Sequence, residues 1–389
     1  MKVLIIHNSY KEYGGEDKVV ESQVKLFKER EIDYITYFCN SNEIDNYTAV
    51  QKLLLLKNGY ASINTKNNIE RLIEEHKPDV AHVHNVYPLI SPIVYSVLKK
   101  HKIPIVQTIH NFRFICPNSL MFNKNRICEK CLIKDSYYQC FFNKCYRQSY
   151  FQSFWYSNII SRAYKKGWLK NVDRFIVFHE FMREKLVEKG FERSKITILP
   201  NFTEASGGEI NQAKEDYFLF IGRLSEEKGI STLLRAANNA DGSIKLYIVG
   251  DGPLKEKVIN FASEHKEKVK YLGFKSGREK EAVIRNAKAV IVPSEWYENF
   301  PTVILESFSL GTTVIGSNIG GIPYMIKNGV NGLVFEPGNE QELNNKIKLI
   351  NSDDRLLSEL SVNAVKSYLS NYTKEKYFEG IKRIYAKIN

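Results

Sequence analysis

Apolar residues in the first half of the chain follow two alternating patterns. Short apolar runs, typical of strands buried on both faces of a parallel sheet, occupy residues 2–7, 79–85, 103–111 and 174–179. Between them, two stretches carry apolar side chains at the spacing of one helix face, at 17–31 and 68–77. Strands and helices in regular alternation predict βαβ units and a parallel sheet.

The alternation stops at a polar, glycine-containing stretch, 203–217, which we interpret as a linker, and then it starts again. The pattern predicts an α/β protein with two Rossmann-like domains whose parallel sheets face a central cleft. The first domain would span 1–202, with a basic insertion at 112–170, and the second would span 203–370. Residues 371–389 add a basic amphipathic helix, and the sequence leaves open whether it packs back on the first domain.

The size and the apolar content fit this organisation. A chain of 389 residues exceeds the length that one core usually serves. No run of about 18 apolar residues occurs, so we expect no membrane span. The opening MKVLIIHNSY has four consecutive apolar residues and no small-residue cleavage site, and we interpret it as a strand rather than a signal peptide. We therefore expect a cytoplasmic protein.

The formal net charge of +12 is concentrated in one segment. Lys99–Lys170 holds 14 basic and two acidic side chains. This excess favours a phosphate-bearing partner, either nucleic acid, an anionic lipid headgroup or a phosphorylated substrate, although a solvated basic surface without a partner has the same composition. No nucleic-acid-binding motif is present, and the second half carries almost no excess charge. We therefore expect no nucleic acid partner.

Three loops that follow strands of the second half carry polar groups suited to a ligand. In open parallel sheets, ligands bind beyond the carboxyl ends of the strands. Arg223 and Lys228 flank a turn that opens a helix, an arrangement that suits a diphosphate. Asp251 and Glu298 follow two other strands. A further carboxylate, Glu306, falls inside an apolar helical segment, where it is rare unless a polar group meets it.

Three motifs of the second half occur together: GRLSEEKGI at 222–230, ENFPTVILE at 298–306 and GGIPYMIKNGVNGLVFEPGN at 320–339. In this order they resemble the donor domain of the family 4 retaining glycosyltransferases, which have the GT-B architecture. The resemblance covers essentially the whole chain and is most specific in residues 217–340.

The resemblance implies a retaining transfer of a sugar from a nucleotide-diphosphate donor, UDP- or GDP-linked. The acceptor would be a saccharide or a polyprenyl-diphosphate-linked sugar, as in bacterial cell-surface polysaccharide synthesis. Such a protein is expected in the cytoplasm, where it would touch the anionic inner face of the plasma membrane.

The resemblance also implies roles for the two glutamates of the E-x7-E pair. The second glutamate of this pair accepts hydrogen bonds from the donor ribose, and Glu306 holds that position. The first contacts hydroxyls of the donor sugar, and Glu298 matches it. Asn299 and Phe300 follow in the same donor-binding loop.

Further residues match groups around the donor diphosphate and the reacting sugar. Arg223 and Lys228 would bind the diphosphate and stabilise the departing nucleotide. Gly14 and Gly15 match a Gly-Gly loop whose backbone approaches the diphosphate, and His110 matches an inter-domain histidine near the reacting sugar. No Asp-x-Asp pair ends a strand convincingly, so we expect no catalytic metal or cofactor. The resemblance implies front-face attack, with the leaving phosphate helping to take the acceptor's proton.

Clustered cysteines depart from the general family pattern. Cys128, Cys131, Cys140 and Cys145 have the spacing C-x2-C-x8-C-x4-C, with Cys116 upstream. In a reducing cytosol, clustered cysteines favour metal over disulfide, and four thiolates would suit a structural zinc site. Free or redox-labile thiols are the alternative.

A stretch just after the cysteines, 146–170, mixes basic and aromatic residues. Phe151, Phe154, Trp155 and Ile159 fall at helical spacing. This pattern is typical of a helix that rests on anionic lipid, and equally of a helix whose apolar face lies in the core.

A sugar-nucleotide epimerase on the same two-domain architecture is the alternative enzyme. As far as the resemblance goes, such epimerases lack the E-x7-E loop. Interconversion of the donor sugar without an acceptor would favour the epimerase.

Overall fold

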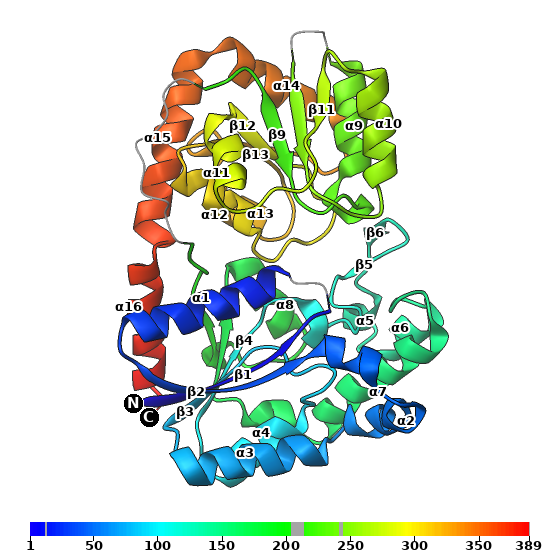
Figure 1. Ribbon diagram of the computed structural model, residues 1–389, viewed down its shortest axis with the longest axis vertical. Helices are drawn as coiled ribbons and strands as arrows, with labels where there is room; N and C mark the ends of the chain where they lie inside the picture. The colour runs from blue at the N-terminus through cyan, green and yellow to red at the C-terminus, as the bar shows by residue number, and fades with distance from the viewer. Residues whose placement is uncertain (12–13, 204–213, 241–243, 389) are drawn as a thin grey trace. The chain divides into compact units, whose positions relative to one another are not determined.

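The computed structural model describes residues 1–11, 14–203, 214–240 and 244–388. These residues form two compact units, each built around a sheet of its own (Figure 1). The first unit comprises Met1–Met121, Glu129–Leu199 and Phe378–Asn389, and the second comprises Phe122–Cys128 and Pro200–Tyr377. Most of the predicted linker, residues 204–213, lies outside the described residues.

The first unit contains a six-stranded sheet in the order β2-β1-β3-β4-β7-β8, and every neighbouring pair is parallel. Its strands are β1 (Lys2–Ser9), β2 (Asp33–Asn40), β3 (Val80–Val83), β4 (Ile105–Thr108), β7 (Arg174–Val177) and β8 (Ile196–Ile198). The central strands are buried on both faces, as the continuous apolar runs predict. The chain order reverses between β1 and β3, which makes this the switch point of the sheet.

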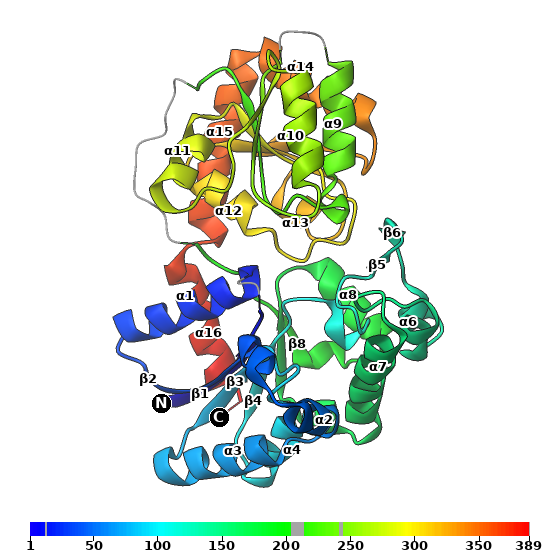
Figure 2. The same cartoon turned by 45° about the vertical axis from the view of Figure 1, so that its right-hand side comes forward.

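The helices of the first unit cover both faces of this sheet (Figures 1 and 2). They are α1 (Gly15–Glu29), α2 (Ala49–Asn58), α3 (Ile63–His76), α4 (Ile93–Lys100), α5 (Lys130–Ile133), α6 (Tyr138–Phe142), α7 (Tyr150–Lys165), α8 (Glu180–Glu188) and α16 (Lys374–Ala386). The last of these packs into the first unit, because the Tyr385 ring lies 6.4 Å from the Phe27 ring and Gly380 lies against Leu199. The C-terminus therefore supports the first sheet.

Helix α7 fits neither sequence interpretation along its whole length. Ile159 is buried at 1% exposure, so the second half of the helix packs in the core. Phe151 and Phe154 are 58% and 46% exposed, so the first two turns present aromatic rings to solvent. The predicted apolar face is thus divided between the core and the surface.

The second unit repeats the architecture, with a parallel sheet in the order β11-β10-β9-β12-β13-β14. Its strands are β9 (Phe218–Ile221), β10 (Leu246–Val249), β11 (Val269–Tyr271), β12 (Ala289–Val292), β13 (Thr313–Ser317) and β14 (Gly332–Phe335). A short hairpin of β5 (Phe122–Asn123) and β6 (Arg126–Ile127) is grouped with this unit. The two parallel sheets confirm the predicted α/β class.

Apolar cores lie on both faces of the second sheet. Alternate residues of β9 enter different cores, because Phe218 and Phe220 point to one face and Leu219 to the other. The helices around them are α9 (Ile230–Asn239), α10 (Lys255–Glu264), α11 (Gly277–Asn286), α12 (Thr302–Ser309), α13 (Ile322–Met325), α14 (Glu340–Ser352) and α15 (Asp354–Asn371). None of the helices in the described parts of the chain is both long and apolar enough to cross a bilayer.

Candidate functional site

The switch point of the second sheet lies between β9 and β12, which are parallel neighbours although two strands separate them in sequence. The loop after β9 carries Arg223 and a short 3₁₀ helix, Glu226–Lys228, that leads into α9. The loop after β12 carries Glu298 and leads into α12. Residues predicted from separate motifs therefore follow two adjacent strands.

Lys228 and Glu298 form an ion pair at this point. The Lys228 Nζ lies 2.6 Å from the Glu298 Oε1, and the Ser294 hydroxyl donates to the same oxygen at 2.7 Å. The Lys228 ammonium also lies 5.0 Å from the centre of the Trp296 ring. Glu298 is only 4% exposed. A carboxylate at this depth requires a partner, and Lys228 supplies it.

Two glycines allow the loops to approach this pair. Gly229 has a φ of +73°, and a Cβ there would lie 1.8 Å from the Pro293 carbonyl oxygen. Gly320 has a φ of +57°, and its Cβ would lie 2.6 Å from the Glu298 carbonyl oxygen. The same oxygen accepts a hydrogen bond from the Gly321 N–H at 2.7 Å. The loop backbones are therefore packed too closely for any side chain at these positions.

Glu306 has the polar partner that its burial requires. It lies in α12, is 9% exposed, and its Oε2 is 2.5 Å from the Nζ of Lys280. Lys280 comes from α11, and sequence reasoning missed it. The signal was faint, because Lys280 is one charge in the highly charged stretch KSGREKE.

The other predicted residues of the second unit have different environments. Arg223 is exposed, whereas Asn299 is buried beside Glu298. The Phe300 ring lies 6.0 Å from the Tyr372 ring. Asp251 lies in an exposed loop, where Lys255 lowers the pKa of its carboxyl by donating a hydrogen bond at 2.9 Å. Asp251 is thus paired with Lys255, at the N-terminus of α10.

In the first unit, His110 follows β4 and meets a second histidine. Its Nε2 lies 2.8 Å from the Nδ1 of His84, which follows β3. The His84 ring stacks on His82 with 4.5 Å between ring centres. Burial lowers the pKa of His82 to about 3, and it also lowers the pKa of His84 and of His110 well below the ordinary value. The three imidazoles are therefore neutral at physiological pH.

Gly14 and Gly15 form the N-terminus of α1. Gly14 has an extended backbone, with φ −127°, and its N–H donates to the Asp17 Oδ2 at 2.9 Å. The other oxygen of Asp17 lies 2.9 Å from the His7 Nε2. Among the described residues, none lies within 4 Å of a Cβ placed on Gly15. Neither glycine has a left-handed backbone that would require it.

Sequence reasoning missed a polar cluster that includes Asn111, the residue after His110. The Tyr10 hydroxyl donates to the Glu16 Oε2 at 2.9 Å, and the Asn111 amide donates to the same oxygen at 3.1 Å. Burial raises the pKa of the Glu16 carboxyl, although the hydrogen bond from Tyr10 opposes this shift. The cluster joins the end of β1, the start of α1 and the loop after β4.

Cys116 interacts with both Cys131 and Cys140, and Cys140 interacts with Cys145. Cys116 hydrogen-bonds Cys131, which together with burial raises the pKa of the Cys116 thiol. Cys140 hydrogen-bonds Cys145, which lowers the pKa of the Cys140 thiol. Among the described residues, no three His, Cys, Asp or Glu side chains are grouped so that they could hold a metal ion.

Zinc at Cys128, Cys131, Cys140 and Cys145 therefore stays a prediction. If these thiolates bind zinc together, protein purified without added metal will contain about one zinc per chain. Elemental analysis of the folded protein measures this directly. Metal-free protein with full secondary structure would contradict the prediction.

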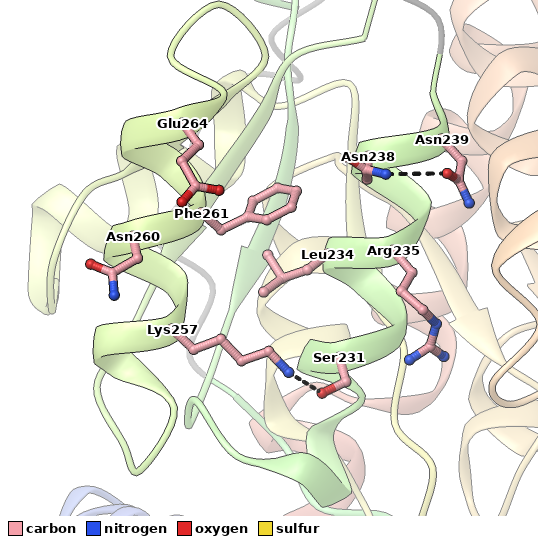
Figure 3. A pocket seen from close by; sticks show the side chains of 9 residues that line it. All are labelled: Ser231, Leu234, Arg235, Asn238, Asn239, Lys257, Asn260, Phe261 and Glu264. Atoms are coloured by element: carbon pink, nitrogen blue, oxygen red, sulfur yellow. Dashed lines mark hydrogen bonds between the residues drawn. The ribbon is translucent and has the colours of Figure 1, made fainter.

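A groove of about 820 Å³ lies between α9 and α10 in the second unit (Figure 3). It is lined by Ser231, Leu234, Arg235, Asn238, Asn239, Lys257, Asn260, Phe261 and Glu264. None of the predicted site residues lines it. Lys257 points across the groove and donates to the Ser231 hydroxyl at 2.8 Å. The groove is thus separate from the strand-end loops that carry Lys228 and Glu298.

Two family models match the chain, one in each half. The family model described as "Glycosyl transferases group 1" matches residues 201–367, and the one described as "Glycosyltransferase Family 4" matches residues 13–206. An uncharacterized glycosyltransferase of Methanocaldococcus jannaschii is 26% identical over 396 aligned positions, which cover 100% of this chain and 99% of the relative.

Solved structures resemble the chain over its whole length. The apo form of the lipopolysaccharide outer core galactosyltransferase WaaB has a TM-score of 0.66 and 19% identity, with 100% of each chain covered. HepE from Anabaena, solved in complex with UDP, has a TM-score of 0.67 and 16% identity, again with 100% of each chain covered. At these identities the likeness is one of fold.

Proposed function

The chain belongs to the family 4 glycosyltransferases with the GT-B fold, and from this membership we propose that it transfers a sugar from a nucleotide-diphosphate donor to a saccharide or lipid-linked acceptor, with retention of configuration. The observation that carries the proposal is the ion pair of the partly exposed Lys228 with the buried Glu298 at the switch point of the second sheet. It combines a cation for phosphate with a carboxylate for sugar hydroxyls.

The donor is proposed to lie along the loops after β9 and β12. Lys228 and Arg223 would bind the diphosphate, next to the N-terminus of α9. Glu298, released from part of its pairing with Lys228, would accept hydrogen bonds from sugar hydroxyls. Glu306 would accept hydrogen bonds from the ribose, and Lys280 would hold its carboxylate in place through the ion pair.

The chemical step is proposed to depend on leaving-group stabilisation. Negative charge develops on the diphosphate as its bond to the anomeric carbon breaks, and the ammonium of Lys228 and the guanidinium of Arg223 would stabilise that charge. Retention would follow from attack on the face that the diphosphate leaves, with a phosphate oxygen taking the acceptor's proton. No residue of the chain needs to act as a nucleophile in this scheme.

Two neighbours support the choice of donor and acceptor. HepE was solved with UDP, which supports a UDP-sugar donor here, with a GDP-sugar as the other candidate. WaaB is a lipopolysaccharide outer core galactosyltransferase, which supports a saccharide or polyprenyl-diphosphate-linked acceptor in cell-surface polysaccharide synthesis. The proposed place of action is the cytoplasmic side of an anionic membrane.

The first unit presents an aromatic and basic surface suited to such a membrane. Exposed apolar side chains project from α2, α6 and α7, namely Val50, Leu53, Leu54, Phe142, Tyr150, Phe151 and Phe154. The Trp155 indole N–H donates to the Leu56 carbonyl at 2.9 Å, which joins α7 to α2 (Figures 1 and 2). Residues 130–165 carry six basic side chains and one acidic side chain, so the surface is complementary to anionic headgroups.

The purified protein is expected to co-sediment with vesicles of phosphatidylglycerol and phosphatidylcholine, and much less with phosphatidylcholine alone. Replacing Phe151 and Phe154 together by serine is expected to weaken binding by about tenfold, because two exposed rings are lost from the interface. Leu369→Ser, at a residue of α15 that is 58% exposed, serves as the matched control. Equal binding of both variants would contradict the assignment of this surface.

Gly15→Ala tests the proposed approach of the donor diphosphate to α1. The methyl group would meet none of the described residues within 4 Å, so we expect stability to stay the same or to rise by up to about 0.5 kcal/mol. Donor KM is expected to rise by about tenfold, because the methyl group would occupy the space next to the helix N-terminus. Thermal unfolding and initial rates measure the two effects. An unchanged KM would remove Gly15 from the donor site.

The function itself is tested by nucleotide release from a panel of UDP-, GDP- and ADP-sugars, with a crude lipid extract as the source of acceptor. Release from one donor, increased by the extract, would support the transferase and identify its donor. Interconversion of the donor sugar without an acceptor would instead favour an epimerase. Absence of turnover with every donor would contradict the proposed function.

A further inference from the structure

Four histidines gather at the carboxyl ends of adjacent strands in the first unit. His7 lies near the end of β1, His82 and His84 lie at the end of β3, and His110 follows β4. The rings of His82 and His84 stack with an interplanar angle of 19°, and the His84 ring lies 5.1 Å from that of His110. Only His110 has a proposed role. The buried rings of His7, His82 and His84 have none so far.

The proton of His82 can be assigned from its partners. Its Nδ1 lies 2.8 Å from the Gln23 Nε2 and 2.6 Å from the Tyr385 hydroxyl. An amide nitrogen can only donate, so the His82 Nδ1 is the acceptor and carries no proton. The proton is therefore on Nε2, which donates to the Thr108 hydroxyl at 2.7 Å.

His84 has a different environment on its two nitrogens. Its Nε2 is buried and has no hydrogen-bond partner among the residues that the structure describes. A proton there would create a buried N–H without an acceptor, which costs more than a bare lone pair. The favoured tautomer carries the proton on Nδ1, and this N–H points to the His110 Nε2 at 2.8 Å.

The orientation of this hydrogen bond determines the state of His110. Its Nε2 accepts from His84, so a neutral His110 carries its proton on Nδ1. The ring is partly accessible and packs against Phe178, with 5.5 Å between ring centres. The nitrogen available to a ligand is thus an N–H donor, which suits a hydroxyl or an ether oxygen and does not suit the removal of a proton.

We propose that His84 is a positioning residue that holds His110 as a neutral imidazole with its proton on Nδ1, so that His110 donates a hydrogen bond to an oxygen of the reacting sugars. The role of His110 in this statement rests on the proposed function. The tautomer does not, because it follows from contacts within the first unit. His82 stacks on the His84 ring and thereby limits its rotation. The Tyr385 hydroxyl of α16 in turn hydrogen-bonds His82.

The first test is an NMR measurement on the full-length protein labelled with ¹⁵N-histidine. The nitrogen resonances of His110, identified by their loss in His110→Asn, are expected to show a protonated Nδ1 and an unprotonated Nε2 between pH 6 and 8. A His110 with its proton on Nε2, or with both nitrogens protonated, would overturn the proposal. This result is independent of any substrate and of the folding of any His84 variant.

The second test compares two substitutions of His84. The amide nitrogen of His84→Asn can take the place of Nδ1, so this variant is expected to keep the His110 tautomer and most of the turnover. His84→Leu loses the donor, and we expect a shift towards the Nε2–H form, with kcat lowered by about tenfold and donor KM unchanged. His76→Asn, at a half-exposed position at the end of α3, controls for the loss of a histidine.

The outcomes distinguish a failure of this inference from a failure of the proposed function. If His84→Leu leaves the His110 nitrogen resonances unchanged, His84 does not position His110, whatever the enzyme does. If the resonances shift in His84→Leu and return in His84→Asn, the positioning role is supported even where no donor is turned over. A fall in kcat that Asn does not restore would indicate a merely structural role and would overturn the proposal.

Discussion

Replacing Lys228 by alanine is expected to lower kcat/KM for the nucleotide-sugar donor by about 10²–10³-fold, because the ammonium that would stabilise the leaving diphosphate is removed. The same change leaves Glu298, which is 4% exposed, with a hydrogen bond from the Ser294 hydroxyl but without the Lys228 ammonium. We therefore also expect the free energy of unfolding to fall by about 1–3 kcal/mol. Steady-state kinetics and denaturant unfolding measure the two effects separately.

Two controls distinguish charge from loss of packing. Lys228→Arg keeps a cation next to Glu298 and is expected to recover part of the activity, although its planar head does not reproduce the ammonium geometry. Lys255→Ala removes the lysine that pairs with exposed Asp251 and is expected to change neither property measurably. If Lys228→Ala retained wild-type kcat/KM, the placement of the donor diphosphate would be wrong.

Glu306→Ala is expected to weaken donor binding by about 10- to 150-fold. A hydrogen bond between a charged group and a ribose hydroxyl contributes about 1.5–3 kcal/mol, and the variant loses the carboxylate that would accept it. Because ribose contacts are present both before and during the reaction, the effect should appear mainly in Kd and KM. Calorimetric titration with the nucleotide diphosphate measures it.

The partner of Glu306 supplies a matched variant. Lys280→Met removes the ammonium that lies 2.5 Å from the Glu306 Oε2 and keeps the carboxylate. We expect a smaller loss of donor affinity, because the carboxylate that would accept from the ribose is still present but is no longer held by Lys280. A Glu306→Ala variant with wild-type affinity would show that the ribose lies elsewhere.

The sequence allowed the strands to be predicted because their signals are local. Buried parallel strands are continuous apolar runs, and β3 and β4 lie inside the stretches expected at 79–85 and 103–111. The predicted stretches were longer than the strands, since each apolar run continues into the loop that follows. Glu306 stood out for the same local reason, as a carboxylate in an apolar segment that needed a partner.

The parts that were missed depend on contacts between distant segments. Nothing in the spacing of Lys280 reveals that α11 packs beside α12, so its pairing with Glu306 could not be read from the sequence. His84 lies in the expected strand 79–85 and looked like a strand residue, whereas its hydrogen-bond partner His110 follows another strand. Helix α2 buries none of its residues, so its exposed apolar side chains gave no clear helical pattern.

The cysteines show the same limit in a different form. Their spacing favours one metal site because C-x2-C is common among zinc ligands, and the fold adds Cys116, which interacts with both Cys131 and Cys140. Cys116 was outside the predicted set of four, and its proximity to Cys131 comes from the packing of the loop after β4. Spacing identifies candidate ligands, whereas the fold decides which of them meet.

We propose that a nucleotide-diphosphate sugar binds at the loops after β9 and β12. Hydrogen–deuterium exchange of the full-length protein with and without saturating UDP or GDP tests this placement. We expect protection in peptides that cover 222–229 and 293–306, and loss of this protection in Glu306→Ala. Protection confined to the groove between α9 and α10, or no protection with either nucleotide, would contradict it.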